Sequence, residues 1–408
     1  MRILIHGLNF SPELTGIGKY TGELAQFLAF SGFDVRVVTS YPYYPQWKIS
    51  NGYPSWRYSI ESNSGLLIIR CPLYVPCSPS TPARMLHLMS FAMSSGLALI
   101  TQIPWKPDVV LSIAPAILAA PFSLLGARLA RSKAWLHIQD FEIYAAQSLG
   151  MLSGAKPLRR LLDKMQERLI RAFDRTSTIS RSMLGHLLAM GVHPTQVELL
   201  PNWVDTKTIR PSAEREAFRA KMGIPDDKIV VLYSGNMGQK QGLEVIIEAA
   251  QILSPHKSYL FVLCGDGAAR PELECLAKGL HNVRFLDVQP LDTLNALLNV
   301  ADIHVLPQRE NVAGLVMPSK LAGMLASGRP VIATAHPRTE LGEIASQVGI
   351  IVPPANADSL ADAIRKLSID PQRRQELGQR GREYAIEHWD KERVLSRFVM
   401  RLYDLHGK

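Results

Sequence analysis

Three turns in the second half of the chain carry the residues best suited to chemistry. They are Ser234–Gly242, Gly265–Arg270 and Pro318–Lys320, and they combine glycine or proline with Lys, Asn, Asp or Ser. Apolar runs rich in β-branched residues precede the first two turns, and helical patterns follow. Backbone N–H groups at such helix starts, together with lysine ammonium groups, favour an anionic ligand. The pattern therefore predicts a site for a phosphate-bearing, nucleotide-like molecule.

Parallel βαβ units must position these turns, because the carboxyl ends of parallel strands share one edge of a sheet. In the second half, strands are expected near 228–234, 259–264, 283–286, 302–306, 330–334 and 349–352. The first half repeats the pattern, with strands expected at 2–8, 33–40, 66–70, 108–113, 134–140 and 175–180. We therefore predict an α/β protein with two doubly wound Rossmann-like domains that face each other across a deep, ligand-holding cleft.

At 408 residues the chain is longer than a domain with a single hydrophobic core usually is, so two domains are expected. The segment 197–212 contains two prolines and shows little periodicity, so we expect it to be the linker between them. We place the domains at 1–205 and 206–389. A last helical stretch, about 390–408, could pack back on the first domain.

Composition and charge limit the classes of partner. The net charge of +9 comes with no nucleic-acid-binding pattern, so a nucleic-acid partner is not expected. The basic run 156–175 alternates with apolar residues at helical spacing, which favours a solvated amphipathic helix or contact with an anionic bilayer. The apolar stretch 85–100 is too short to span a bilayer and predicts a buried or interfacial helix.

The N-terminal sequence and the cysteines bear on the cellular compartment and on metal binding. The chain opens with a strand pattern in place of a basic and apolar leader, which predicts a cytoplasmic protein. Its four cysteines lack metal-ligand spacing, and reduced thiols are expected. Cys264 lies in an apolar run and is expected in the core. We expect neither a cofactor nor a metal ion.

A dinucleotide-dependent oxidoreductase is one alternative. Its fingerprint needs GxGxxG directly after the first strand and a carboxylate about 20 positions further on. Gly16-Ile17-Gly18 comes well after that strand, and Gly265-Asp266-Gly267 lacks the third glycine. The positions of these glycines therefore disfavour a dinucleotide-dependent oxidoreductase. A non-catalytic binding protein remains open.

Several motifs together resemble a known family. SGNMGQKQGLEVIIEAA, CGDG, ADIHVLPQ and SGRPVIAT are similar to the retaining GT-B glycosyltransferases of family 4. PELTGIGKYTGELA, YPYYPQW, QDFE, LPNWVD and MPSKLAGMLASG narrow the resemblance to the bacterial colanic-acid and O-antigen type. The likeness runs from Arg2 to about Trp389.

The resemblance implies a GT-B fold without an essential metal ion. The C-terminal domain would bind a nucleoside diphosphate sugar, and the N-terminal domain would bind a lipid-linked saccharide at the inner face of the membrane. The enzyme would transfer the sugar with retention of configuration, in the biosynthesis of a surface polysaccharide. A GT-B nucleotide-sugar epimerase is the alternative enzyme.

The resemblance also assigns residues in the C-terminal domain. Lys240 and Lys320 are expected to stabilise the leaving diphosphate. Pro318 would lie in the first turn of a helix whose free N–H groups face the phosphates. The expected donor-binding residues of this domain are Asn236, Gly265, Asp266, Val288, Glu310, Pro318 and Ser319.

This chain departs from the family at three positions of the C-terminal domain. Asn236 stands where relatives commonly carry an arginine, and Leu315 and Gly323 stand where many carry glutamates, the second of which binds the donor ribose. Glu310 is the upstream candidate to compensate.

In the N-terminal domain, Gly16 and Gly18 match the loop that approaches the donor phosphates. Asp140 is expected to be catalytic, next to the donor-binding Gln139. Many relatives carry histidine in place of Gln139, and the amide is compatible with a fucose-type 6-deoxy sugar. His137 is expected in the core or hydrogen-bonded. Glu13, Lys19 and Tyr20 are expected to contact the acceptor.

Overall fold

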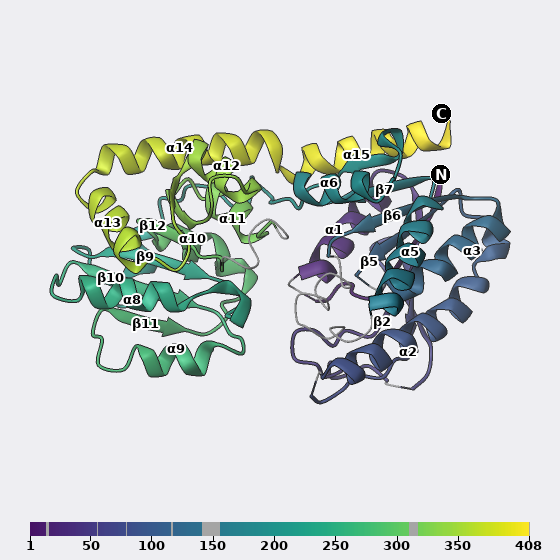
Figure 1. Ribbon diagram of the computed structural model, residues 1–408, viewed down its shortest axis with the longest axis horizontal. Coiled ribbons are helices and arrows are strands. Elements are labelled where there is room, and N and C mark those ends of the chain that lie inside the picture. The colour runs from purple at the N-terminus through teal and green to yellow at the C-terminus, as the bar shows by residue number, and fades with distance from the viewer. Residues whose placement is uncertain are drawn as a thin grey trace. The chain divides into compact units, whose positions relative to one another are not determined.

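The computed structural model describes the chain except residues 14, 15, 55, 79, 116, 141–155, 310–316 and 408, and except the side chains of 156–159, 162 and 240. The chain forms two compact units (Figure 1). Unit 1 comprises Met1–Pro201 and Leu395–Lys408, and unit 2 comprises Asn202–Val394.

Unit 1 is built on an eight-stranded sheet in the order β3-β4-β2-β1-β5-β6-β7-β8. Only β3 is antiparallel to its neighbour. The strands are β1 Arg2–Gly7, β2 Asp34–Ser40, β3 Ser59–Asn63, β4 Leu66–Cys71, β5 Val109–Ala114, β6 Lys133–Ile138, β7 Arg175–Thr178 and β8 Val197–Leu199.

Two of these strands correct the expectations from sequence. The segment expected to be wholly linker begins with β8, whose Val197 pairs with Thr176 of β7. The strand β3 lies at the sheet edge with polar, largely exposed residues, so it lacks the apolar run used to find the others. In addition, β6 ends at Ile138, and Gln139 and Asp140 therefore follow the strand.

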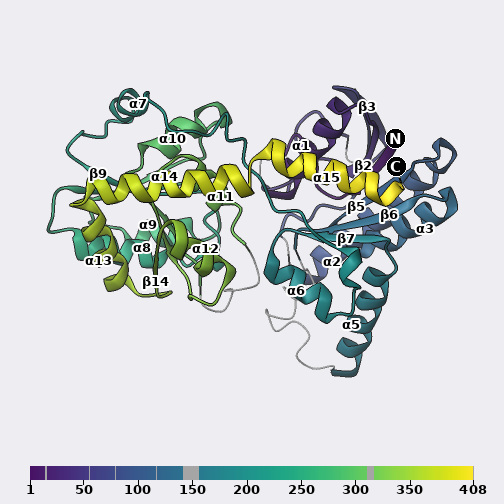
Figure 2. The ribbon, with the colours of Figure 1, turned by 90° about the horizontal axis from the view of Figure 1, so that it is seen from above.

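Helices cover both faces of this sheet (Figures 1 and 2). Residues of α2, α3, α5 and α6 share one apolar cluster with Val110 and Leu136. On the other face, Phe398 of α15 packs against Trp135 with ring centroids 4.9 Å apart. The helices of unit 1 are α1 Gly16–Phe30, α2 Thr81–Ile100, α3 Ala120–Ala130, α5 Lys156–Arg171, α6 Arg181–Ala189 and most of α15 Lys391–His406, which begins in unit 2, with short turns η1 Ile103–Trp105, η2 Ile117–Ala119 and η3 Pro194–Gln196.

The helix α2 is longer than the apolar stretch predicted it to be. It begins at Thr81, with Pro82 in its first turn, and is 20 residues long. The length argument against a membrane span was therefore wrong. Within the described part of the chain, α2 is the one helix long and apolar enough to span a bilayer, but 39% of its most apolar 18-residue stretch is buried in the protein.

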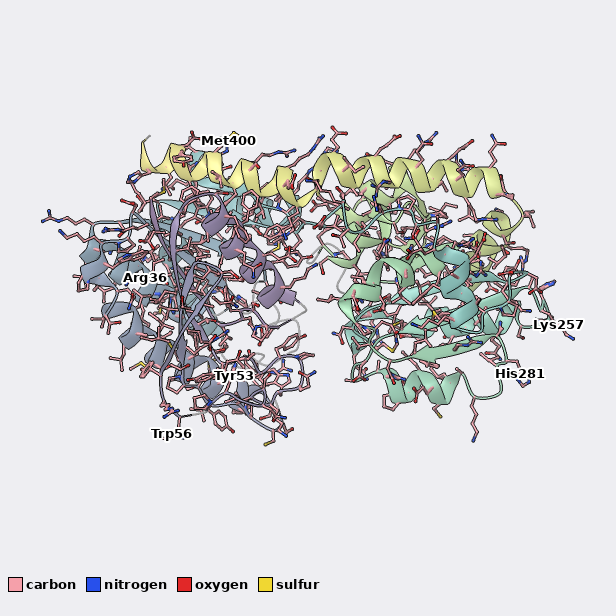
Figure 3. All side chains as sticks on the ribbon, turned by 180° about the vertical axis from the view of Figure 1, so that it is seen from behind. Arg36, Tyr53, Trp56, Lys257, His281 and Met400 are labelled. Carbon is pink, nitrogen blue, oxygen red and sulfur yellow. The ribbon has the colours of Figure 1, made fainter. Side chains whose placement is uncertain are left out.

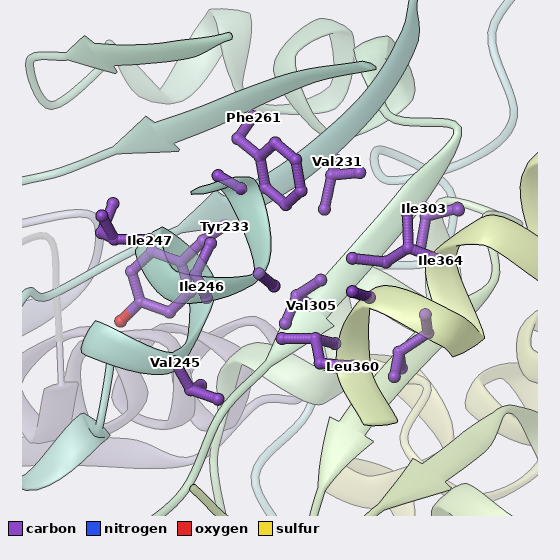
Figure 4. Packing of buried hydrophobic residues seen from close by; sticks show 14 of the residues in the cluster. Val231, Tyr233, Val245, Ile246, Ile247, Phe261, Ile303, Val305, Leu360 and Ile364 are labelled. Atoms are coloured by element: carbon purple, nitrogen blue, oxygen red, sulfur yellow. The ribbon is translucent and has the colours of Figure 1, made fainter. Parts of the chain in front are cut away.

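Unit 2 contains a six-stranded parallel sheet in the order β11-β10-β9-β12-β13-β14. Val231, Phe261 and Val305 of the sheet pack against Leu360 and Ile364 of α13 (Figure 4). The strands are β9 Ile229–Ser234, β10 Tyr259–Cys264, β11 Val283–Leu286, β12 Ile303–Leu306, β13 Val331–Thr334 and β14 Ile350–Val352. The helices are α7 Arg215–Lys221, α8 Glu244–Leu253, α9 Arg270–Leu276, α10 Leu294–Val300, α11 Lys320–Ala326, α12 Glu340–Val348, α13 Ala357–Ser368 and α14 Pro371–His388, with short turns η4 Gln239–Gln241 and η5 Leu291–Thr293. The expected doubly wound sheets are thus present in both units.

Candidate functional site

The turns that follow β9 and β10 form one hydrogen-bonded surface at the carboxyl edge of the unit 2 sheet. The two strands pair in register, with Ser234 opposite Cys264. The Gly235 N–H donates to the Cys264 carbonyl at 2.9 Å, and the Met237 N–H donates to the Asp266 carbonyl at 2.8 Å. The predicted donor residues Asn236, Gly265 and Asp266 are therefore brought together.

Glycine is required where these turns approach each other. A Cβ added to Gly265 would lie 2.0 Å from the Gly235 carbonyl oxygen, and one added to Gly267 would lie 2.5 Å from the Met237 carbonyl oxygen. Both glycines also have positive φ angles, 144° and 153°, which disfavour other residues. The close contact explains the CGDG motif in physical terms.

Lys320 reaches this surface from the start of α11. Its Nζ donates to the Tyr233 hydroxyl, and to the Asn236 carbonyl at 3.2 Å. The stem crosses Gly235, where an added Cβ would lie 2.5 Å from Lys320 Cε. Tyr233, which is 1% exposed, donates in turn to the Asn236 carbonyl at 2.6 Å. The predicted phosphate ligand Lys320 is thus held at the turn that contains Asn236.

Burial raises the free energy of the charged form of Lys320 when no anion is bound. Desolvation lowers the pKa of Lys320 to about 7, and it raises the pKa of Tyr233. Among the described residues, the hydrogen-bond partners of Lys320 are neutral oxygens. A phosphate group would supply the missing countercharge.

Two arginines at this edge of the sheet were not among the candidate residues predicted from the sequence. Arg270 donates to the Gly265 carbonyl at 2.9 Å and to Asp287 Oδ1 at 2.7 Å. Arg309 follows β12, pairs with Glu244 at 2.8 Å, and lies beside Gly242, where an added Cβ would be 2.9 Å from Arg309 Cγ. Arg270 closes a turn that the sequence did indicate. Arg309 is far from the Ser234–Gly242 turn in sequence, so no local signal could link them.

The predicted helix start at Pro318 needs a correction. The helix α11 begins at Lys320, and Ser319 is its N-cap, although its side chain makes no capping hydrogen bond. Pro318 therefore precedes the helix, and its carbonyl accepts from the Leu321 N–H at 3.1 Å.

Five further positions of this domain were singled out from the sequence, and the structure describes the side-chain surroundings of two of them. Val288 follows β11 and is 65% exposed. The Gly323 Cα faces Leu298, whose Cδ1 would be 3.6 Å from an added Cβ. The side chain of Lys240, in η4, and the residues Glu310 and Leu315 lie outside the described part of the structure.

In unit 1, Glu13 anchors a loop. The carboxylate is 5% exposed and accepts from Asn9 Nδ2 at 2.9 Å and from the N–H groups of Tyr43 and Tyr44 at 3.1 and 3.0 Å. Desolvation raises its pKa, against the opposing effect of these hydrogen bonds. A Cβ on Gly18 would lie 2.6 Å from Glu13 Oε2. Glu13 thus joins the YPYYPQW loop to the start of α1.

The neighbouring candidates occupy the same helix start. Gly16 has a φ of 61°, and Lys19 lies 3.9 Å from Glu23 and 5.3 Å from the ring of Tyr20. Tyr20 was expected to contact the acceptor, but it is only 5% exposed, so its side chain is a core residue of unit 1 in this structure.

The end of β6 carries the remaining candidates. Gln139 is 8% exposed, whereas Asp140 is exposed. His137 is buried with Nδ1 2.9 Å from Ser177 Oγ, and burial lowers its pKa to about 4, as expected for a core histidine. Among the described residues, no group of three or more His, Cys, Asp or Glu side chains could hold a metal ion.

Comparison with known proteins defines the class. The model of the family "Glycosyl transferases group 1" matches residues 214–384, and that of the "Glycosyl transferase 4-like domain" matches residues 15–203. The structure resembles the sucrose-phosphate synthase of Thermosynechococcus elongatus, with a TM-score of 0.78, 20% identity and coverage of 100% and 99% of the two chains. It also resembles Anabaena HepE in complex with UDP and glucose, with a TM-score of 0.71, 14% identity and coverage of 99% and 100%. The fold is GT-B.

One relative is similar over almost its entire length. The chain is 40% identical to the putative colanic acid biosynthesis glycosyl transferase WcaI of Escherichia coli K12, over 98% of this chain and 99% of that protein. The probable glycosyltransferase WbjE of Pseudomonas aeruginosa is 28% identical over 64% and 66% of the two chains. The chain belongs to the group 1, family 4 glycosyltransferases, and it is a glycosyltransferase.

Proposed function

We propose that the chain transfers a sugar from a nucleoside diphosphate sugar to a hydroxyl of a lipid-linked saccharide, in the biosynthesis of an exopolysaccharide. The observation that carries the proposal is the Lys320 ammonium, held by neutral oxygens at the carboxyl edge of a parallel sheet. The names of two similar proteins support it, since one is assigned to colanic acid biosynthesis and the other was solved with UDP and glucose. Transfer takes place at the membrane surface, where a lipid-linked acceptor is anchored.

In this proposal, unit 2 holds the donor diphosphate. Lys320 and Lys240 stabilise the negative charge that develops as the bond between the anomeric carbon and the diphosphate oxygen breaks. Arg309 supplies a third cation and takes the role of the arginine that Asn236 replaces. Its position beside Gly242 and its partial exposure support this role.

The candidate residues of unit 1 contact the transferred sugar and the acceptor or position the loops that do so. The acceptor oxygen bonds to the anomeric carbon on the face from which the diphosphate leaves, and the acceptor proton passes to the departing phosphate oxygen. Asp140 and Gln139 contact the sugar, and Lys19 contacts the acceptor, whereas the buried Tyr20 packs within unit 1. Glu13 acts by positioning the loop that contains Tyr43 and Tyr44, as its three hydrogen bonds suggest.

A donor screen tests the proposal. UDP-, GDP- and other nucleotide sugars are compared for the rise they cause in melting temperature, because a ligand that binds only the folded state stabilises it. At least one is expected to stabilise the protein, and to release its nucleoside diphosphate only when lipid-linked saccharide is added. A product epimerised from donor alone would favour an epimerase, and stabilisation by none of the nucleotides would refute the proposal.

The same assay is repeated with EDTA, which chelates divalent metal ions. Because cationic side chains are proposed to neutralise the diphosphate, transfer is expected to continue at an unchanged rate in EDTA. Complete loss of transfer, restored by Mg²⁺ or Mn²⁺, would contradict that mechanism.

A further inference from the structure

One face of α2 exposes a continuous apolar stripe. With 3.6 residues per turn, the six side chains that form it fall within an arc of about 120°. Each is between 49% and 62% exposed, which is unusual for large apolar residues that lie together. The six are Met85, Leu86, Met89, Met93, Leu97 and Ile100.

The opposite face of α2 belongs to the core of unit 1. Phe91 and Leu99 are 0% and 1% exposed, and Leu99 packs in the cluster that covers the sheet. A transmembrane orientation would remove these side chains from the sheet. The helix is therefore fixed along the surface of unit 1, with its stripe facing outward.

The neighbouring helix α3 also exposes large apolar side chains. The helix α3 packs against α2, since an added Cβ at Gly126 would lie 2.2 Å from Leu99 Cδ2. Leu125 and Leu129 of α3 are 51% and 58% exposed. We define the α2–α3 surface as the six stripe residues together with Leu125 and Leu129.

Aromatic residues stand beside the α2–α3 surface. The Tyr58 hydroxyl donates to the Ser94 carbonyl of α2 at 3.0 Å, and the Tyr74 N–H donates to Ser90 Oγ at 2.9 Å. Both rings are partly exposed, and Trp56, two residues before Tyr58, is 78% exposed at the periphery of unit 1 (Figure 3). Tyr and Trp with one apolar and one polar end are typical of the interface between water and lipid.

The chain segment that contains α2 and α3 is poor in acidic residues. From Pro72 to Gln139 the only acidic residue is Asp108, which accepts from the Arg2 backbone N–H at 2.7 Å. The same segment contains five basic residues: Arg84, Lys106, Arg128, Arg131 and Lys133. Arg84 and Arg128 lie on α2 and α3 themselves and are exposed. The two helices thus carry exposed arginines as well as exposed apolar side chains.

We propose that the α2–α3 surface docks on an anionic lipid bilayer, with α2 lying in the plane of the headgroups. Apolar burial and attraction of basic side chains to anionic headgroups are additive contributions to such binding. The purpose of this docking rests on the proposed function, because docking would bring the enzyme to a lipid-linked acceptor. The binding itself can be measured without substrate.

Vesicle sedimentation of the full chain tests the proposal. Wild type is expected to sediment with vesicles that contain phosphatidylglycerol, and to bind pure phosphatidylcholine vesicles much more weakly. The double variant Met93→Asp/Leu97→Asp is expected to lose at least tenfold in binding. Arg84→Gln/Arg128→Gln is expected to lose binding mainly at low ionic strength. Ile369→Asp is the matched control, since Ile369 is an apolar residue of unit 2 that is 80% exposed, and it should bind as wild type does.

Three results would overturn the proposal. They are equal vesicle binding by wild type and Met93→Asp/Leu97→Asp, absence of binding to any vesicle, and a dimer in solution that this variant dissociates without any vesicle binding. The melting temperature and its rise with nucleotide are measured on each variant, to show that the fold and the donor site are intact. If no nucleotide stabilises even wild type, the proposed function fails, while vesicle binding still decides the docking proposal.

Discussion

At the scale of single residues, the proposed binding of the donor rests on the Lys320 ammonium. Where the structure describes its surroundings, its hydrogen-bond partners are the Tyr233 hydroxyl and the Asn236 carbonyl, and burial lowers its pKa to about 7. A diphosphate favours the protonated form. Binding of the anion should therefore be coupled to uptake of a proton when the pH is above the pKa of the free site.

This coupling predicts a pH dependence for nucleotide affinity. Below pH 7 Lys320 is already protonated in the free protein, and affinity should vary little on its account. Above pH 7 the affinity for UDP or GDP should fall, by up to about tenfold per pH unit. Calorimetry between pH 6 and 9, in buffers of different ionisation enthalpy, measures both the affinity and the proton uptake. A flat profile without proton uptake would contradict the assignment.

Tyr233 is predicted to position Lys320. Tyr233→Phe removes the hydroxyl that accepts from Lys320 and donates to the Asn236 carbonyl. Loss of one hydrogen bond of about 1 kcal/mol should weaken nucleotide binding about fivefold and alter its pH profile. Tyr259→Phe is the control, since Tyr259 is in the same sheet and its hydroxyl bonds to Ser368 at 3.0 Å. Equal affinities in the two variants would refute the role of Tyr233.

At the scale of elements, the register of β9 and β10 brings their following turns into contact. Gly265→Ala should destabilise the protein by at least 1 to 3 kcal/mol, because the backbone conformation disfavours alanine and the new Cβ would collide with Gly235. Nucleotide binding should weaken as well. Gly185→Ala in α6 is the control, since its Cβ would have no neighbour within 4 Å. Denaturant unfolding of both variants provides the comparison, and equal stability would show that the close approach is not required.

The elements that sequence could predict are those with buried apolar runs. All six strands of unit 2 and six strands of unit 1 were expected near their observed positions. The exposed edge strand β3 and the short β8 were missed, because neither carries such a run. The same reasoning placed the start of α2 too late, since its first turn contains Thr81, Pro82 and Arg84 in place of apolar residues.

The candidate site was predicted only where a turn motif marked it. Lys320 and the two glycine turns have recognisable local patterns. Tyr233 has the pattern of a core strand residue, and its contact with Lys320 joins positions 87 residues apart. Arg309 becomes relevant only through its position beside Gly242. Contacts of this kind depend on strand order, which sequence patterns do not determine.

At the scale of the whole molecule, the chain returns to unit 1 after completing unit 2. Phe398 of α15 is 3% exposed and packs against the fully buried Trp135. Phe398→Ala should therefore cost about 3 to 5 kcal/mol of stability. Met400→Ala is the control on the same helix, since Met400 is 58% exposed, and it should cost little (Figure 3). Equal unfolding midpoints in denaturant would show that α15 contributes little to unit 1.

The central claim is that Lys320 of a GT-B glycosyltransferase stabilises the leaving diphosphate. The most direct measurement is the rate of nucleoside diphosphate release during sugar transfer to lipid-linked saccharide, by wild type, Lys320→Met and the exposed-lysine control Lys257→Met. Lys320→Met should lower kcat about 100-fold with an unchanged melting profile, and Lys257→Met should match wild type. Wild-type turnover by a folded Lys320→Met variant would contradict the claim.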